Sequence, residues 1–286
     1  MKMAVIGCGL IGGSMALSWK RAGIVDEVIA FGHNPATLQK ALDKGAADTV
    51  TTSMEEAVKD ADIVVSAVPV EAMESVFTEM APFLKSDAVV TDVGSTRQTV
   101  IAAARKGLGD KFHQYAPAHP IAGGEMPGVD YASADLFDEK VVISTPDEGM
   151  DPKVVTFIEE AWRKAGARVQ AMSPLQHDLT FASVSHLPHV LAYALVDMIA
   201  REENAQEKLK MAGAGFRDFT RIASSSPVMW RDICPSNREA LSHELKRYRA
   251  SLDTLQKYID ESDGKALESV FENAVRNRRG LVFPGK

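Results

Sequence analysis

Two short segments of this chain place a side chain that can move a proton directly after an apolar run. Ser95 lies in DVGSTR and His119 in AHPIAGGE. Histidine suits proton abstraction near neutrality because its unperturbed pKa is about 6.5. An enzyme that oxidises an alcohol must remove the hydroxyl proton as hydride leaves the carbon. We therefore take His119 and Ser95 as candidate catalytic residues; the alternative for His119 is a structural histidine beside a proline.

The stretch GAGFRDFTRIASSSPVMWRDI (213–233) is rich in apolar residues yet carries many charges. Its expected core residues are Phe216, Phe219, Ile222, Val228, Met229 and Trp230, and its charged residues are Arg217, Asp218, Arg221, Arg231 and Asp232. Arg221 needs a partner in this setting, which Asp218 or Asp178 could supply. An arginine held at a cleft binds a carboxylate through two parallel hydrogen bonds. The alternative is an ion network that only ties helices together.

The segment HDLTFASVSHLPH (177–189) contains three histidines, and Pro188 predicts a kink or a helix start there. A metal site would need His177 as a third ligand beside His186 and His189. We disfavour a metal because neither cysteine of the chain lies nearby in sequence. Histidines satisfied in a core remain an alternative.

The segment GCGLIGGS (7–14) matches the pattern G-x-G-x-x-G after an apolar strand and at the start of a helix. In a dinucleotide-binding fold, Gly7 permits the tight turn, Gly9 lets the backbone approach a pyrophosphate and Gly12 lets the helix pack closely. The free N–H groups of the helix N-terminus attract the phosphates. Further cofactor contacts are expected from Leu10, Ile11, Val68 and Pro69. The alternative is a glycine-rich turn without a ligand.

His33 stands where NAD-binding sites usually carry an acidic residue that holds the ribose hydroxyls. No carboxylate is present there to repel a 2′-phosphate, and both His33 and Asn34 can donate hydrogen bonds to one. The sequence therefore favours NADP slightly over NAD as the cofactor. No arginine follows at once, which keeps this preference small.

The elements that must position these residues change character along the chain. Strand patterns at 3–7, 27–33, 62–69, 87–94, 140–145 and 167–172 alternate with helical patterns in the first part. Such units predict a doubly wound parallel sheet wrapped by helices, the Rossmann type. From Leu175 onward we find helical periodicity and almost no strand signal. We place a dinucleotide-binding domain at 1–172 and a helical substrate and dimerisation domain at 173–286.

The bulk composition excludes several classes of protein. The chain has 286 residues, two cysteines and a formal net charge of −7, with no long basic run, so a nucleic-acid partner is not expected. Two cysteines cannot make a disulfide framework, which favours a reducing cytoplasmic location. The apolar run 179–200 is long enough to span a membrane but contains two histidines, a proline and an aspartate. We expect a buried helix or a dimer interface instead.

Taken together, these motifs resemble the prephenate and arogenate dehydrogenases of tyrosine biosynthesis. The similar segments are GCGLIGGS, DVGS, HPIAGGE, HD followed by SHLPH, and FRDFTRIASSSPVMWRDI, and they cover nearly the whole chain. The resemblance implies a Rossmann domain followed by a helical domain that forms a homodimer. It implies an NAD(P)-dependent oxidoreductase that moves hydride from ring carbon C4 of a small substrate and releases carbon dioxide from C1.

The resemblance also implies roles for individual residues. His119 would receive the proton of the ring hydroxyl, with Ser95 as its helper. Arg221 would bind a substrate carboxylate, supported by an ionic network of Asp218 and Asp178. The remaining pocket positions that match the family are His189, Glu125 and Trp230. His33 departs from the acidic residue that many NAD-using members carry, which affects cofactor preference and not the reaction.

Two alternatives remain from different classes. A 3-hydroxyacid dehydrogenase of the 6-phosphogluconate type shares the two-domain plan but usually needs a catalytic lysine in the helical half, where this chain offers histidines and Arg221. A non-catalytic NAD(P)-sensing protein needs the glycine loop but gives no reason to combine Ser95, His119 and Arg221.

Overall fold

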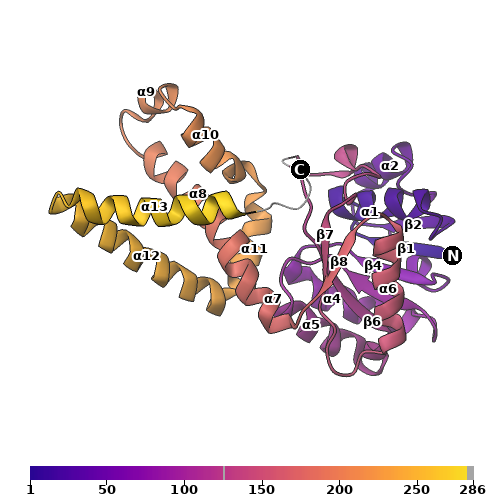
Figure 1. Ribbon diagram of the computed structural model, residues 1–286. Helices are drawn as coiled ribbons and strands as arrows, with labels where there is room; N and C mark the ends of the chain where they lie inside the picture. The colour runs from indigo at the N-terminus through magenta and orange to yellow at the C-terminus, as the bar shows by residue number, and fades with distance from the viewer. Residues whose placement is uncertain (125, 282–286) are drawn as a thin grey trace.

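The computed structural model describes residues 1–124 and 126–281, which form two parts of different architecture (Figure 1). The described chain up to Ala171 builds a sheet with helices around it, and from Pro174 onward it is helical. The predicted order of an α/β sheet followed by a helical region is confirmed. The last strand of the sheet ends at Ala171 and the first helix of the second part begins at Pro174, so the expected boundary after residue 172 lies between them.

The sheet has eight strands in the order β3-β2-β1-β4-β5-β6-β7-β8. The strands are β1 (Lys2–Ile6), β2 (Glu27–Phe31), β3 (Thr49–Thr51), β4 (Ile63–Ser66), β5 (Val89–Asp92), β6 (Tyr115–Pro120), β7 (Val141–Ser144) and β8 (Arg168–Ala171). The order reverses between β1 and β4, and the crevice at the carboxyl ends of these two strands is where such sheets bind dinucleotides.

One strand pair departs from the fully parallel sheet that the sequence predicts. β6 and β7 run antiparallel, with His119 opposite Ile143. Parallel neighbours need a crossover long enough to carry the chain back across the sheet. The described residues between β6 and β7 contain no α-helix and only a 3₁₀ turn at Val129–Tyr131, so the chain returns in the opposite direction.

Helices cover both faces of the sheet. They are α1 (Leu10–Arg21), α2 (Pro35–Asp43), α3 (Met54–Val58), α4 (Met73–Met80), α5 (Gln98–Leu108) and α6 (Pro152–Lys164). The order grows outward in opposite directions from β1 and β4, so right-handed crossovers put α1 and α4 on opposite faces. α6 shares the face of α1, where Trp19 and Trp162 meet edge to face with ring centroids 5.6 Å apart. α5 packs beside α4.

The helical part begins with a long interrupted helix. Its segments are α7 (Pro174–Phe181), a π-helical turn at Ala182–His186 and α8 (Leu187–Ala200). Pro188 lacks an N–H group and its ring crowds the preceding turn, which a wider π turn relieves. The helix start expected at Pro188 is thus found one residue earlier, at Leu187. By length and composition the span 174–200 could cross a membrane, and only 22% of its most apolar window is buried within the chain.

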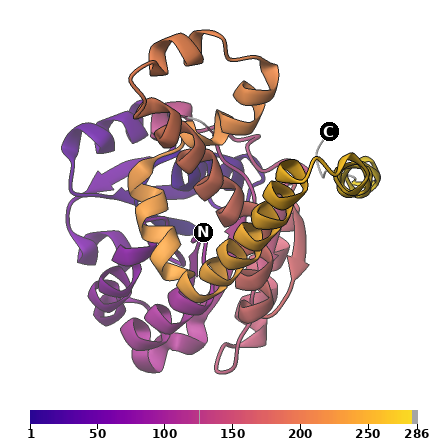
Figure 2. The same cartoon turned by 90° about the vertical axis from the view of Figure 1, so that its left-hand side faces the viewer.

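The remaining helices form a lobe beside the sheet. They are α9 (Ala205–Lys210), α10 (Ala214–Thr220), α11 (Pro227–Ser236), α12 (Arg238–Asp260) and α13 (Gly264–Gly280). α12 and α13 run side by side as a long antiparallel pair that points away from the sheet (Figure 1), and Figure 2 shows α13 nearly end-on at the flank of the molecule.

The prediction that the apolar residues of 213–233 form a core is only partly correct. Trp230 is buried, but Phe219, Val228 and Met229 are 46%, 51% and 40% exposed. Phe216 and Ile222 are half-buried, and Arg221 is exposed. An apolar periodicity predicts that a helix buries one face but not what covers it, and among the described residues nothing covers this face fully.

Candidate active site

The glycine loop has the geometry of a dinucleotide cradle. Gly7 has φ +92°, and a Cβ atom on Gly12 would lie 2.5 Å from the carbonyl oxygen of Gly7, so both positions require glycine. A Cβ atom on Gly9 would meet nothing within 4 Å, and no side chain caps the helix that Gly9 begins. The open space and the free N–H groups of α1 fit a pyrophosphate. Burial raises the pKa of the neighbouring Cys8 to about 11, so its thiol stays protonated.

The other expected cofactor residues surround this loop. Leu10 and Ile11 form the first turn of α1, and Leu10 approaches the backbone of Gly124 in the loop after His119. Val68 follows β4 and its side chain approaches Gly7. Pro69 lies beside it and is exposed. The loops after β1, β4 and β6 therefore meet at one edge of the sheet.

His33 and Asn34 are both exposed just beyond the end of β2. The ring of His33 stands edge-on to Phe31, with centroids 5.2 Å apart. Oδ1 of Asn34 accepts hydrogen bonds from the N–H groups of Ala36 and Thr37 and so caps α2. The cap uses Oδ1 of Asn34, and its side-chain NH₂ group remains as a donor.

His119 is joined to a second histidine, His177, for which the sequence suggested a metal ligand or a core residue and no link to His119. Nδ1 of His119 lies 2.7 Å from Nε2 of His177, although the residues are 58 positions apart. Nδ1 of His177 lies 2.9 Å from Oδ1 of Asp178. His119 belongs to β6, and the other two belong to α7. The result is a chain of three side chains, Asp178–His177–His119, that crosses between the two parts of the molecule.

Asp178 is fixed by the start of α5. Its carboxylate oxygens accept hydrogen bonds from the backbone N–H groups of Arg97 at 2.8 Å and Gln98 at 2.9 Å. Burial would raise the pKa of Asp178, but the bonds from His177 and from these two backbone groups bring it below its ordinary value. The carboxylate is therefore ionised and can only accept hydrogen bonds.

This bonding pattern determines which nitrogen of His119 is free. Since Asp178 only accepts, Nδ1 of His177 must carry a proton, and the Nε2 of a neutral His177 must then accept one from Nδ1 of His119. Burial lowers the pKa of both rings, that of His119 well below 6.5, with the charge of Arg97 adding to the effect. Both rings are thus neutral near pH 7. Nε2 of His119 keeps an open lone pair, as a general base requires.

Ser95 lies in the loop after β5, and β5 is the parallel neighbour of β6, the strand that carries His119. An ion pair that sequence analysis missed supports this loop: Arg97 and Asp92 are completely buried, 2.6 Å apart. Arg97 also donates to the carbonyl of Ala118, the residue before His119. The advance signal was that DVGSTR contains both members of this pair, Asp92 and Arg97, although nothing in the sequence shows that they are buried together.

His186 and Asn237 lie next to the same loop. The amide nitrogen of Asn237 is 3.1 Å from Nδ1 of His186 and 2.8 Å from the carbonyl oxygen of Asp178. Burial lowers the pKa of His186 to about 4, and a hydrogen bond between its ring and the backbone of Ser95 opposes this shift. Neither residue was assigned a role from the sequence.

The expected substrate residues lie on the helical side of the site. His189 stacks on Trp230 with ring centroids 3.9 Å apart, and His186 meets the edge of Trp230 at 5.9 Å. Burial lowers the pKa of His189, the hydrogen bond with the carbonyl of Ser185 opposes this shift, and the positive charge of Arg221, within electrostatic range of the ring, lowers the pKa further. Glu125 lies outside the described residues.

The ionic network expected around Arg221, with Asp218 and Asp178, stays a prediction. Asp178 directs its carboxylate oxygens to His177 and to the start of α5. Sequence distance suggested Asp218, whereas the fold gives Asp178 a position between two domains. The described residues also contain no group of three His, Cys, Asp or Glu side chains placed to hold a metal ion.

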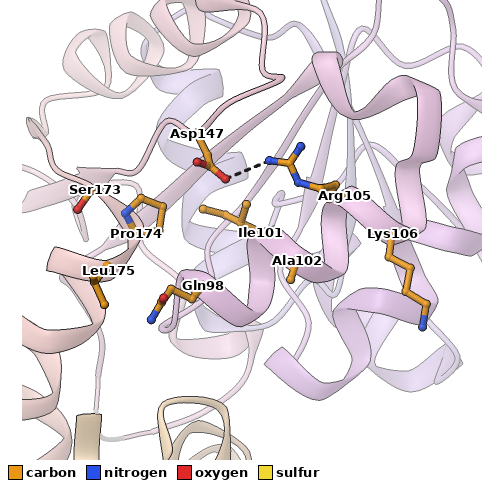
Figure 3. A pocket seen from close by; sticks show the side chains of 9 residues that line it. All are labelled: Gln98, Ile101, Ala102, Arg105, Lys106, Asp147, Ser173, Pro174 and Leu175. Atoms are coloured by element: carbon orange, nitrogen blue, oxygen red, sulfur yellow. Dashed lines mark hydrogen bonds and ion pairs between the residues drawn. The ribbon is translucent and has the colours of Figure 1, made fainter. Parts of the chain in front are cut away.

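A separate cavity of about 580 Å³ opens between α5 and the start of α7 (Figure 3). It is lined by Gln98, Ile101, Ala102, Arg105, Lys106, Asp147, Ser173, Pro174 and Leu175. Arg105 is paired with Asp147 across it. None of the candidate catalytic or substrate residues lines this cavity, so it is not the active site.

Comparison with known families covers most of the chain. Residues 15–171 match the model described as prephenate dehydrogenase, nucleotide-binding domain. Residues 173–273 match the model described as prephenate dehydrogenase, dimerization domain.

Individual relatives agree with these matches. A cyclohexadienyl dehydrogenase of Zymomonas mobilis is 36% identical, over 98% of this chain and 95% of the relative. A prephenate dehydrogenase of Bacillus subtilis is 34% identical, over 98% of this chain and 76% of the relative. Among solved structures, the Aquifex aeolicus prephenate dehydrogenase in complex with hydroxyphenyl propionate and NAD+ superposes with a TM-score of 0.89, 34% identity and 98% coverage of both chains. A Synechocystis arogenate dehydrogenase gives 0.81, 27% identity, and coverage of 99% and 100%.

Proposed function

Because this chain belongs to the prephenate dehydrogenase family, we propose that it catalyses the NAD(P)-dependent oxidative decarboxylation of prephenate, arogenate or both, a step of tyrosine biosynthesis. The observation that carries the proposal is the Asp178–His177–His119 chain, which leaves one histidine nitrogen as a proton acceptor beside the dinucleotide cradle.

In this proposal His119 handles the proton of the ring hydroxyl. Nε2 accepts that proton as C4 is oxidised, and Ser95 helps to hold the hydroxyl. When the C1 carboxylate leaves as carbon dioxide, its bonding electron pair makes the ring aromatic and the oxygen regains its proton from His119. A bound nicotinamide cofactor supplies the hydride acceptor. Burial keeps the pKa of His119 low, so the ring is neutral and free to accept the proton in the first step, and once protonated it returns the proton readily in the second.

Substrate carboxylates are assigned to Arg221, with His189, Trp230 and Glu125 as further pocket residues. Both candidate substrates carry a carboxylate on the ring and another on the side chain. A buried carboxylate without a partner is very costly, and an arginine fork offers charge and two aligned hydrogen bonds. The position of Arg221 within electrostatic range of His189 supports this assignment. Asp218 is retained as a second supporting carboxylate on α10.

The residues of the glycine loop fit a dinucleotide, and we propose NADP as the slightly preferred form. The support is the exposed pair His33 and Asn34, which offers donors and no carboxylate at the ribose. NAD remains compatible with the same cradle.

We further propose a cytoplasmic homodimer. Large apolar side chains remain exposed along 174–200 and on α12 and α13, among them Val184 at 67%, Met198 at 58% and Phe271 at 54%. A second copy that covers them would bury the span 174–200 in protein and not in lipid. The match of 173–273 to a dimerization domain supports this assembly.

The test is direct. Purified protein is mixed with NAD or NADP and with prephenate or arogenate, and reduced cofactor is followed by its absorbance. We expect turnover with at least one of the four pairs, together with release of carbon dioxide. Reduction of cofactor without carbon dioxide would contradict the proposal, as would no turnover with any pair.

A further inference from the structure

We propose that Asn237 is a positioning residue for this reaction: it fixes the ring protonation of His186 so that this ring holds the backbone of Ser95. The inference rests on the proposed function of Ser95, and it deepens that function by adding Asn237, which no sequence motif indicated, and a role for His186. It begins from the two contacts of a single amide nitrogen.

The orientation of Asn237 follows from its neighbours. A carbonyl oxygen only accepts hydrogen bonds, so the group of Asn237 that lies 2.8 Å from the carbonyl of Asp178 must be the amide NH₂. One of its two hydrogens is used there. The other is left for Nδ1 of His186 at 3.1 Å. Asn237 is 4% exposed, so water does not compete for these hydrogens.

The protonation of His186 follows in turn. A nitrogen that accepts from an amide carries no hydrogen, and the neutral ring must then carry its proton on Nε2. His186 is 1% exposed, and its pKa of about 4 keeps it neutral at pH 7. The remaining N–H group is then available to the nearby backbone of Ser95, whose interaction with the ring partly offsets the lowering of its pKa.

The residues around Asn237 hold the same loop at adjacent points. Ser236 bonds the hydroxyl of Thr96 at 2.7 Å through its own hydroxyl. Asp178 holds the backbone of Arg97 and Gln98. Asn237 therefore connects the His186–Ser95 contact to the residue that orients His177 and His119. Asn237 lies between α11 and α12. Its one side chain bonds His186, which contacts Ser95, and Asp178, which orients His177 and His119.

The test combines ring spectroscopy with kinetics. Protein labelled with ¹⁵N-histidine, without ligands and at pH 7, is examined by long-range ¹⁵N–¹H correlation, and the His186 signals are assigned by their loss in His186→Gln. We expect Nε2–H in the wild-type ring. Asn237→Asp keeps the shape but removes the donor, so the proton should move to Nδ1 or the ring should become charged. The kcat should fall at least tenfold, with the KM for cofactor changed less than twofold.

Two further variants make the result decisive. Thr99→Val removes another contact between the two parts, from the Thr99 hydroxyl to the carbonyl of Ser236, and should leave both the His186 signals and kcat unchanged. Asn237→Ser keeps one donor hydrogen and should lose less activity than Asn237→Asp. A wild-type ring protonated on Nδ1 would overturn the inference, as would Asn237→Asp with unchanged ring signals and kcat. A wild-type protein without dehydrogenase activity would instead overturn the proposed function, because the ring signals are read without substrate.

Discussion

His119 owes its proposed chemistry to two neighbours more than to its own strand. The ring would bond equally well through either nitrogen, and the contact with His177 leaves Nε2 as the acceptor. The sequence identified His119 as a candidate base but could not indicate which nitrogen reacts, because His177 and Asp178 come from a helix 58 positions later.

Replacing the base gives the first prediction. His119→Asn should lower kcat by about a hundred- to ten-thousandfold, the range for loss of a general base, with a small change in cofactor affinity. Steady-state kinetics on the folded variant measures this, with the exposed His113→Asn as control. Near-normal turnover would remove His119 from the mechanism.

Arg221 tests the binding of substrate charge. Arg221→Ala should raise the KM for the organic substrate far more than that for NAD(P). The expected loss of substrate binding is about 2–5 kcal/mol, the range for truncating one member of a charge pair that the bound substrate would bury. Arg221→Lys should recover part of this loss because it restores the charge without the fork. Kinetics with both ligands varied would show it. An unchanged substrate KM with a lower melting temperature would make Arg221 a structural tie.

Cofactor choice depends on His33. The wild-type kcat/KM should be at least as high with NADP as with NAD, and His33→Asp should shift the ratio toward NAD, since a carboxylate binds ribose hydroxyls and repels a 2′-phosphate. Comparing both cofactors in the two proteins gives the ratio. A wild-type enzyme that strongly favours NAD would show that His33 does not select the cofactor.

At the scale of elements, substitutions at two glycines of the loop after β1 should have different effects on cofactor binding and on stability. Gly9→Ala adds a methyl group into open space, so the melting temperature should hold while the KM for cofactor rises at least tenfold. Gly12→Ala places the methyl group 2.5 Å from a carbonyl oxygen and should lower the melting temperature as well. Thermal unfolding and cofactor titration of both variants test this. Equal effects of the two variants on stability would contradict the assignment of Gly9 to the cofactor.

The strands also show which parts of the fold the sequence pattern predicts and which it does not. Apolar runs located β1, β2, β4, β5 and β7, because a buried strand needs a continuous apolar stretch. The segment ARVQAM predicted β8, although that strand is mostly exposed. β3 was missed because it has three residues, Thr49–Thr51, none of them buried. The antiparallel β6–β7 pair was missed because direction depends on the connection. The candidate site residues named from the sequence each belong to a local motif, whereas no motif indicated Asn237 or the contacts of His186, because their partners are distant in sequence.

For the whole molecule, four histidines with lowered pKa values predict a loss of stability in mild acid. They are His119, His177, His186 and His189. The unfolded chain binds a proton below its pKa of about 6.5, before the folded ring does, so stability falls as the pH drops through that value. For His186, whose folded pKa is about 4, the loss at pH 5 is about 2 kcal/mol at 1.36 kcal/mol per pKa unit.

The measurement is urea unfolding at pH 7 and pH 5 at fixed protein concentration. His186→Gln should reduce the difference between the two free energies of unfolding by about 2 kcal/mol, because glutamine does not titrate. The exposed His113→Gln serves as control and should leave that difference unchanged. An identical pH dependence in wild type and His186→Gln would mean that His186 takes up its proton equally in both states.

The histidine pair that spans the two parts has a consequence for the ancestry of such enzymes. His119 is contributed by the sheet and His177 by the helical lobe, so neither half alone holds an oriented base. Exchanging one half for that of a distant relative would preserve the nucleotide cradle and still lose the reaction unless both rings and the Asp178 contact to α5 were exchanged as a matched set. The two halves are therefore expected to be inherited together, and gene fragments encoding them separately should regain turnover only on reassociation.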